Sequence, residues 1–149
     1  MASAKKAAFA LALFLVVGCD SFEAAAPEGF ATYEGNRPFR AMSPDGVVYR
    51  VRNVSDPSDA TLAFWQEALK KRMLDAGYTF LRDGEAKSAN GEGYVLEVTA
   101  PYGVRDYTYL MAVFKKDKHL VVVESSGEVT TFEKRRPEVI AAIGKLTVN

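Results

Sequence analysis

Cys19 carries the most reactive side chain in this sequence, and it is the sole cysteine among 149 residues. Thiolates are strong nucleophiles, so a single cysteine can accept a covalent group. The neighbours of Cys19 indicate which group. Lys5 and Lys6 come first, the apolar run 7–17 follows, and the small residue Gly18 directly precedes the cysteine. A basic start, a short apolar core and a small residue at the cut together predict a secretory signal peptide.

The sequence Leu-Val-Val-Gly-Cys at residues 15–19 resembles the lipobox of bacterial lipoproteins. The resemblance implies that Sγ of Cys19 takes a diacylglycerol and that the chain is cut between Gly18 and Cys19. It therefore implies a location in the cell envelope, with the membrane as a partner through the lipid on Cys19. Asp20 resembles the retention signal of enterobacterial lipoproteins, which favours the outer face of the cytoplasmic membrane over the outer membrane.

Other interpretations of Cys19 stay open at this point. The apolar run 7–17 is well short of the ~20 residues of a membrane-spanning helix, which argues against an uncleaved anchor. An ordinary secretory signal, cut beyond Cys19, would fit the alanines at 24–26. A free core cysteine is hard to reconcile with a place directly after a signal. Without a second cysteine, an exported domain has no disulfide and depends on its core alone.

The charge balance limits the classes of partner. The whole chain has 19 basic and 19 acidic side chains, and removal of residues 1–18 leaves a formal charge of −2. This balance argues against nucleic acid and against a polybasic surface that binds lipid on its own. We expect a signal peptide over 1–18, a lipidated tether over 19–32 and a single α+β globular domain over 33–149.

The remaining sequence predicts separate runs of strand and helix. Residues 38–54 predict a hairpin around the turn Ser-Pro-Asp-Gly at 43–46. Residues 56–76 predict the long helix, with Asp56 as its N-cap and Trp65 on an apolar stripe that packs against the sheet. Four later segments predict an antiparallel meander whose last member is a central strand: 78–81, 94–100, 107–114 and 120–124.

A second helix is predicted over 133–145, with Pro137 in its first turn. Separate strand and helix runs favour the α+β class over a parallel α/β sheet. One helix on each face of the sheet would bury both faces, which explains the nearly continuous apolar strands. The expected architecture is an N-terminal hairpin, a long helix, a meander and a C-terminal helix, packed as an α-β-α sandwich.

This element order, with the hairpin turn at 43–46 ahead of the long helix, resembles the PsbP-like fold. That family contains extrinsic photosystem subunits and bacterial envelope lipoproteins. The resemblance covers about residues 33–146 and implies a binding or assembly module. It brings no ligand residues with it, because no family motif aligns with the sequence.

Catalytic signatures are missing from the sequence. His119 is the only histidine and lies beside a charged turn, which is typical of a strand-edge residue exposed to solvent. We predict neither metal site nor cofactor, because one histidine and one cysteine do not make a ligand set. We expect a protein that is not an enzyme. The alternative is an envelope hydrolase of cell-wall or carbohydrate substrates that uses carboxylates such as Glu97, Asp106 or Glu124.

One group of residues suits recognition. Tyr102, Arg105, Tyr107 and Tyr109 lie around one predicted turn, with Tyr94 on the preceding strand. Tyrosine and arginine are favoured at binding surfaces because they combine a large contact area with a polar tip. Tyrosines in strands also commonly pack the sheet, and we favour that interpretation. The candidate partners of this surface are an envelope protein or a carbohydrate.

Overall fold

The computed structural model describes residues 21–35 and 38–149. Along the chain the elements are β1 (Phe22–Glu23), β2 (Ala31–Thr32), β3 (Phe39–Met42), β4 (Val48–Ser55), α1 (Leu62–Asp75), β5 (Thr79–Lys87), β6 (Glu92–Tyr102), β7 (Arg105–Lys116), β8 (His119–Glu128), α2 (Val129–Gly144) and β9 (Thr147–Val148). Seven strands form one antiparallel sheet in the order β2-β3-β4-β8-β7-β6-β5, and β1 pairs with β9 in a second, two-stranded sheet. The structure confirms the predicted α+β class.

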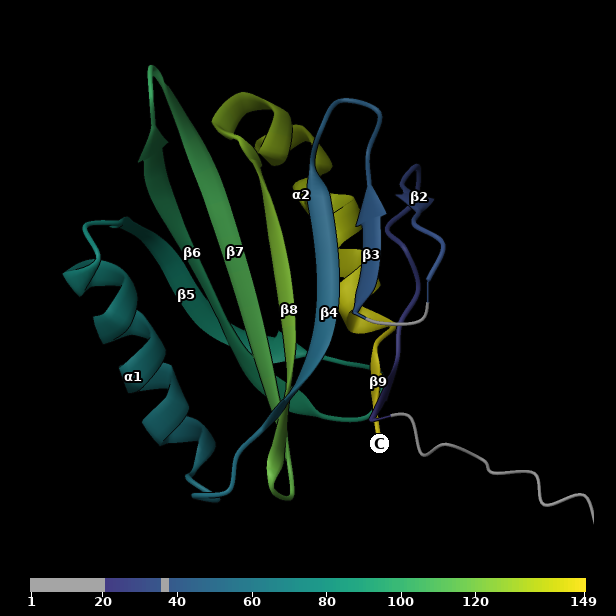
Figure 1. Cartoon of the computed structure of the whole chain (residues 1–149), viewed down its shortest axis with the longest axis vertical. Coiled ribbons are helices and arrows are strands. Elements are labelled where there is room, and N and C mark those ends of the chain that lie inside the picture. Colours follow the sequence, from purple (N-terminus) through teal and green to yellow (C-terminus); the bar gives the residue numbers. More distant parts are fainter. Residues whose placement is uncertain (1–20, 36–37) are drawn as a thin grey trace, which may run out of the picture.

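The two helices lie on opposite faces of the large sheet, as predicted. Figure 1 shows α1 in front of the β5–β6 side and α2 behind the sheet. The chain crosses from β4 to β5 through α1 and then returns along the meander β5-β6-β7-β8. The meander ends beside β4, so β8 is the central strand. Residues 120–124 were predicted to be central, and the β4–β8 pairing confirms it.

The core is much tighter behind the sheet than in front of it. On the α2 side, Phe132, Val139 and Ile143 of the helix are buried against apolar side chains of β4, β7 and β8. On the α1 side, no residue of the helix itself is fully buried. Trp65 and Leu69 of α1 are half-buried against Val113, Leu120 and Val122. The predicted apolar stripe therefore contacts the sheet, but α1 covers only part of this face.

The long helix starts later than predicted. Asp56 is not its N-cap: Thr61 caps α1, and its Oγ1 accepts a hydrogen bond from the Phe64 amide. Asp56 is buried and accepts hydrogen bonds from the Ser58 hydroxyl and from Nε1 of Trp65. The Asp-Pro pair thus forms a turn ahead of the helix, because Asp56 is engaged by side chains rather than by free helical amides.

The second helix starts earlier than predicted. It begins at Val129, directly after β8, and the Glu128 carboxylate caps it by accepting from the Thr131 amide. Pro137 therefore lies in the helix interior and not in its first turn. A proline there removes one helical hydrogen bond and bends the helix. Figure 1 shows a first part of α2 across the top of the sheet and a second part running down behind it.

The predicted tether is largely part of the fold. Phe22 pairs with Val148 in the β1–β9 sheet, and its side chain is only 5% exposed in the core behind the sheet. Ala31 and Thr32 belong to the large sheet through β2. The domain therefore begins at about residue 21 and not at 33, because Phe22 has apolar surface to bury. Cys19, Asp20 and the predicted signal peptide lie outside the described residues.

Within the part of the chain that the structure describes, neither helix combines the length and the apolar character needed to cross a membrane.

Candidate functional site

The structure places all four residues of the predicted recognition surface on the α1 face of the sheet. Tyr107 and Tyr109 alternate with residues of β7 that face α2. Tyr102 is the cross-strand partner of Arg105 at the end of the β6–β7 hairpin. Residues directly opposite each other in an antiparallel pair point to the same face. The hairpin register therefore brings the four side chains to one side.

The tip of this hairpin is strongly exposed. The side chain of Tyr102 is 77% exposed, and that of Val104 is fully exposed. The rings of Tyr102 and Tyr107 pack edge to face, with 5.8 Å between centroids. Gly103 has a positive φ of 64°, which a tight hairpin turn requires. We call Tyr102, Val104, Arg105 and Tyr107 the distal surface.

Tyr109 differs from the other three. Its ring packs beside the buried side chains of Tyr94, Leu96 and Val98. Its hydroxyl donates a 2.6 Å hydrogen bond to Oε1 of Glu124 on β8. Tyr109 thus packs the sheet in the way that strand tyrosines commonly do, and it also fixes a carboxylate.

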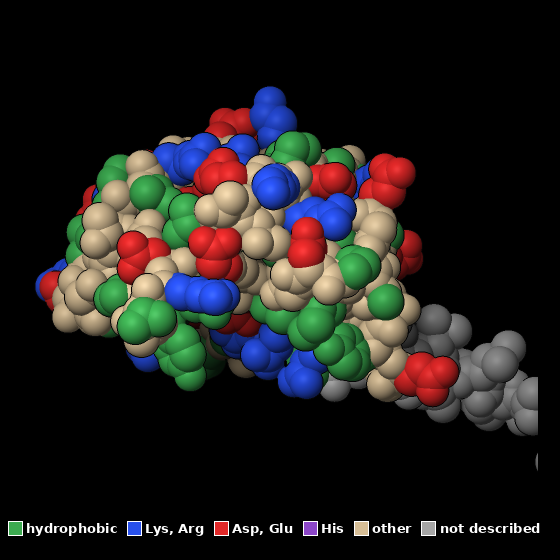
Figure 2. Space-filling view, turned by 90° about the horizontal axis from the view of Figure 1, so that it is seen from above, with side chains coloured by type: hydrophobic (Ala, Val, Ile, Leu, Met, Phe, Trp, Pro, Cys, Tyr) green, Lys and Arg blue, Asp and Glu red, His purple; other side chains and the backbone are tan. Residues whose placement is uncertain are grey.

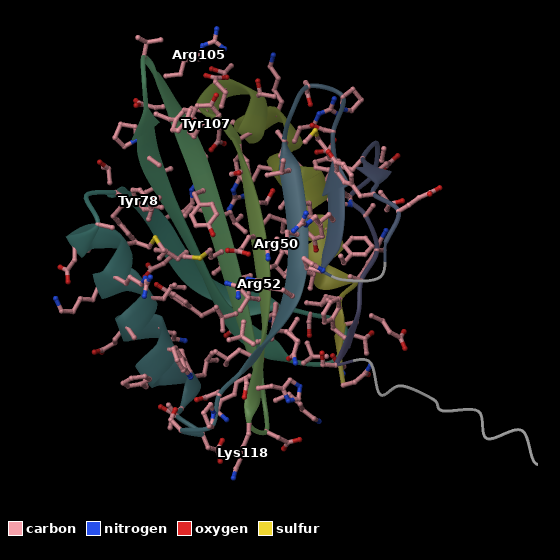
Figure 3. The ribbon with its side chains drawn as sticks, viewed as in Figure 1. Arg50, Arg52, Tyr78, Arg105, Tyr107 and Lys118 are labelled. Atoms are coloured by element: carbon pink, nitrogen blue, oxygen red, sulfur yellow. The ribbon has the colours of Figure 1, made fainter. Side chains whose placement is uncertain are left out.

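That carboxylate is the centre of a small network on the same face. Nε of Arg52 donates to Oε2 of Glu124 over 2.9 Å, and Nη1 of Arg50 lies 3.8 Å from the same oxygen. We call Arg50, Arg52, Tyr109 and Glu124 the arginine–glutamate cluster. In Figure 3 the labels of Arg50 and Arg52 lie midway along the open face, below Tyr107 and Arg105.

Glu124 is held in its ionised form. Burial by itself would raise the pKa of Glu124, but hydrogen bonds from Arg52 and Tyr109 and the charges of both arginines outweigh burial and lower this pKa. Burial and the bond to Glu124 both raise the pKa of Tyr109. At neutral pH the tyrosine is therefore a hydrogen-bond donor and the glutamate an anion. With two arginines and one glutamate, the cluster keeps one excess positive charge.

Sequence reasoning missed the arginine–glutamate cluster. Alternation along β4 places Arg50 and Arg52 on one face, and the sequence shows that alternation. Glu124 becomes their neighbour only because β4 pairs with β8, with Arg50 opposite Glu124. These strands are more than seventy residues apart in the chain, so no local signal reports the pairing.

The distal surface lies at the end of the sheet opposite the start of the domain. Figure 1 shows the β6–β7 hairpin at the top and the β1–β9 sheet near the bottom, where the chain continues toward residue 20. Figure 2, seen from the hairpin end, shows Lys and Arg side chains next to Asp and Glu side chains over this end of the molecule. The distal surface therefore sits among mixed charges, far from the N-terminal end of the domain.

The candidate catalytic carboxylates do not converge. Glu97 pairs in register with Leu110 and faces α2, where it is 1% exposed and accepts from Nε of Arg136 over 2.9 Å. Glu124 is on the opposite face of the same sheet. Asp106 is exposed near the hairpin tip. A pair of carboxylates that acts on one substrate must face one cleft, and Glu97 and Glu124 are separated by the sheet.

A hollow with three acidic side chains in its lining lies between α1 and β5. It has a volume of about 470 Å³, and its lining includes Glu67, Asp75 and Asp83. Asp83 accepts from the Tyr94 hydroxyl and from Nζ of Lys70, and these bonds lower its pKa. Asp75 is paired with a lysine of its own helix. Asp75 and Asp83 therefore form ion pairs with lysines, which does not suit a general acid or base.

The described residues also contain possible metal ligands and the single histidine. Across residues 21–35 and 38–149, no three His, Cys, Asp or Glu side chains come together in a way that could hold a metal ion. His119 begins β8 and is partly exposed, and its Nε2 lies 3.2 Å from the carbonyl oxygen of Asn149.

The fold has counterparts among solved structures. LpqN, described as involved in cell envelope biogenesis of Mycobacterium tuberculosis, is similar with a TM-score of 0.63 and 8% identity, over 86% of this chain and 83% of that one. Cyanobacterial PsbP (CyanoP) from Synechocystis is similar with a TM-score of 0.61 and 15% identity, over 87% of both chains. A crystal structure from Bacteroides thetaiotaomicron has a TM-score of 0.56 and 14% identity, and the match covers 45% of that chain.

At these identities the likeness concerns the fold alone. No protein-family model matches the sequence, and neither does any curated protein. The predicted resemblance to the PsbP-like fold is confirmed by the similarity to CyanoP.

Proposed function

We propose that this protein is a lipid-anchored, non-enzymatic binding or assembly module of the cell envelope, with its partner bound at the distal surface. The anchor is proposed from the signal-peptide pattern and the lipobox that ends at Cys19. The fold, shared with LpqN and CyanoP, supports a module of this kind.

The observation that carries the proposal is the placement of two features at opposite ends of the domain. The chain enters the domain at β1, and the exposed hairpin of the distal surface is at the other end (Figure 1). A lipid on Cys19 would hold the first end at the bilayer. The distal surface would then point away from the membrane, where a partner can reach it.

The chemistry of the distal surface suits a protein partner. Val104 and Tyr102 expose apolar surface at a projecting tip, and Arg105 adds a fork of hydrogen-bond donors. Aromatic residues and arginine dominate the binding energy of many protein interfaces. The arginine–glutamate cluster lies on the same face and offers one excess positive charge to an acidic partner.

The alternative of an envelope enzyme has less support. Its candidate carboxylates Glu97 and Glu124 face opposite sides of the sheet, and each is paired with arginine. Among the described residues we find no nucleophile next to a general base in a shared cleft. We therefore propose binding rather than catalysis.

The anchor is tested in cells that express the full chain. Growth with a clickable fatty acid should label the parent protein, and the protein should pellet with membranes. Cys19→Ala should be neither labelled nor retained, because it has no thiol to acylate. Labelling or membrane retention of Cys19→Ala would contradict the lipobox interpretation.

The binding surface is tested with a photo-crosslinking amino acid at Val104. We expect a discrete crosslinked product in cells, which disappears when Tyr102→Ala and Arg105→Ala are added. The same crosslinker at Lys118, at the other end of the sheet in Figure 3, serves as the matched control. A partner captured at residue 118 but not at 104 would overturn the assignment of the distal surface.

A further inference from the structure

The end of the domain opposite the distal surface carries exposed lysines in the β7–β8 hairpin. Lys116, Asp117 and Lys118 are all exposed, and Lys116 is the cross-strand partner of His119. Figure 3 shows Lys118 at the bottom of the molecule. Among the residues that the structure describes, the side chains of Lys116 and Lys118 have no ion-pair partner. Both ammonium groups are available to an external anion.

This hairpin adjoins the point where the chain enters the domain. The amide of Asn149 donates a 3.0 Å hydrogen bond to the carbonyl oxygen of Ser21. The carbonyl oxygen of Asn149 in turn lies 3.2 Å from Nε2 of His119. Ser21, Asn149 and His119 are therefore consecutive neighbours in space, and Lys118 directly precedes His119 in the chain.

Two peptide units separate Ser21 from Cys19. Such a link spans at most about 7 Å, even when fully extended. Because β1 is paired with β9 and Phe22 is buried, the folded domain begins almost at the anchor rather than after a long tether. A lipid on Cys19 would hold this end of the domain within roughly one Debye length of the headgroups, where charges still act on each other.

The hairpin is held firmly in this position. The carbonyl oxygen of Lys118 accepts a 2.8 Å hydrogen bond from the Asp56 amide. Lys115 pairs with Asp59 at 2.5 Å, so its charge is already neutralised. Other exposed acids near this end include Asp117 in the turn, Glu23 in β1 and Glu92 at the start of β6, which is the cross-strand partner of Lys87. Lys116 and Lys118 are therefore exposed, unpaired positive charges on a hairpin whose position these contacts fix.

We infer that the β7–β8 hairpin is a membrane-contact surface in which Lys116 and Lys118 bind the phosphates of anionic lipid headgroups. This inference rests on the proposed attachment at Cys19. Without residues 1–18 the chain has a formal charge of −2. It therefore has no excess positive charge that would bring it to an anionic membrane by itself. The covalent anchor recruits the protein, and the two lysines then fix its orientation. The β1–β9 end faces the membrane, and the distal surface points away from it.

The test attaches the mature chain, starting at Cys19, to vesicles that carry a maleimide phospholipid. This chain contains every strand and helix of the structure, and Cys19 is its only thiol. The vesicles are made either of phosphatidylglycerol mixed with phosphatidylcholine or of phosphatidylcholine alone. Acetylation of each lysine by a water-soluble ester is followed by mass spectrometry. Lys134, exposed near the start of α2 at the distal end, is the internal control.

On phosphatidylglycerol vesicles we expect Lys116 and Lys118 to be acetylated about fivefold more slowly than in the uncoupled chain, as expected for one lysine at an anionic surface. Lys134 should react at an unchanged rate, and 1 M NaCl should remove the protection. If coupling to these vesicles slowed the acetylation of Lys116 and Lys118 no more than that of Lys134, the inference would be overturned. Equal protection on pure phosphatidylcholine would overturn the role of anionic lipid, because proximity alone would then explain it.

The maleimide link supplies the anchor whether or not cells acylate Cys19. Failure of the proposed lipidation would appear as membrane release of the parent protein in cells, whereas failure of this inference would appear as unprotected lysines on anionic vesicles. The two failures are therefore distinguishable.

Discussion

The hydroxyl of Tyr109 and the carboxylate of Glu124 are joined by a 2.6 Å hydrogen bond on the open face of the sheet. Together with Arg52, this bond stabilises the ionised carboxylate in a partly buried place. The state of Glu124 therefore links the stability of the domain to pH.

Glu124→Gln should lower stability by about 2 kcal/mol at pH 7, because charge-assisted hydrogen bonds are replaced by neutral ones. The folded pKa of Glu124 lies below its usual value of 4.5. Its contribution is therefore fully present above about pH 4.5 and is lost as the pH falls through the folded pKa. Urea unfolding should give free energies of unfolding for parent and variant that converge as the pH falls below about 4.5. Glu67→Gln, on the exposed side of α1, is the control. Its free energy of unfolding should differ from that of the parent by a small amount that is nearly constant with pH.

Trp65→Ala should cost about 2–3 kcal/mol, which is less than the ~3–5 kcal/mol of a fully buried tryptophan because Trp65 is only half-buried. Trp65→Phe keeps most of the ring contact but loses the 3.0 Å bond from Nε1 to Oδ2 of Asp56. We expect it to lie between parent and Trp65→Ala in melting temperature. A Trp65→Ala variant with the same melting temperature as the parent would contradict the contact between α1 and the sheet.

Phe22→Ala should release β1 from the core. The loss of a buried phenylalanine costs ~3–5 kcal/mol in a rigid site, and here the terminal strands can detach locally without unfolding the large sheet. We expect faster hydrogen exchange at the Asn149 amide, which bonds to Ser21, and little change in β7 and β8. Phe64→Ala is the matched control, since Phe64 is exposed on α1. Unchanged exchange at Asn149 in Phe22→Ala would mean that Phe22 does not hold β1 in place.

Asp20 leads us to expect the protein at the outer face of the cytoplasmic membrane in a host with two membranes. Density-gradient fractionation should place the parent with cytoplasmic-membrane markers and move Asp20→Ser toward the outer membrane. A parent that bands with outer-membrane markers would contradict this expectation, wherever the variant bands.

The sequence predicts the elements of this fold better than their contacts. The Ser-Pro-Asp-Gly turn and the alternation in β6 report local geometry, and both appear in the structure where they were expected. The start of α1 was misplaced because Asp56 is the better cap in isolation, whereas in the structure its carboxylate accepts from Trp65 and Thr61 caps the helix.

Pairings between distant segments were beyond local reasoning. The sequence Asp-Ser-Phe-Glu at 20–23 is typical of a tether, and nothing near it reveals that Phe22 meets Val148. The same holds for Glu124 and the two arginines of β4. The tyrosine–arginine group was found because its members are neighbours along one hairpin, and its role in recognition stays a prediction.

The pairing of β1 with β9 also sets the order in which the chain can fold. Phe22 can join its strand partner only once residues 147 and 148 are available for pairing. Closing a loop of more than a hundred residues is slow compared with forming the hairpins of the meander. The segment next to Cys19 is therefore among the last to dock.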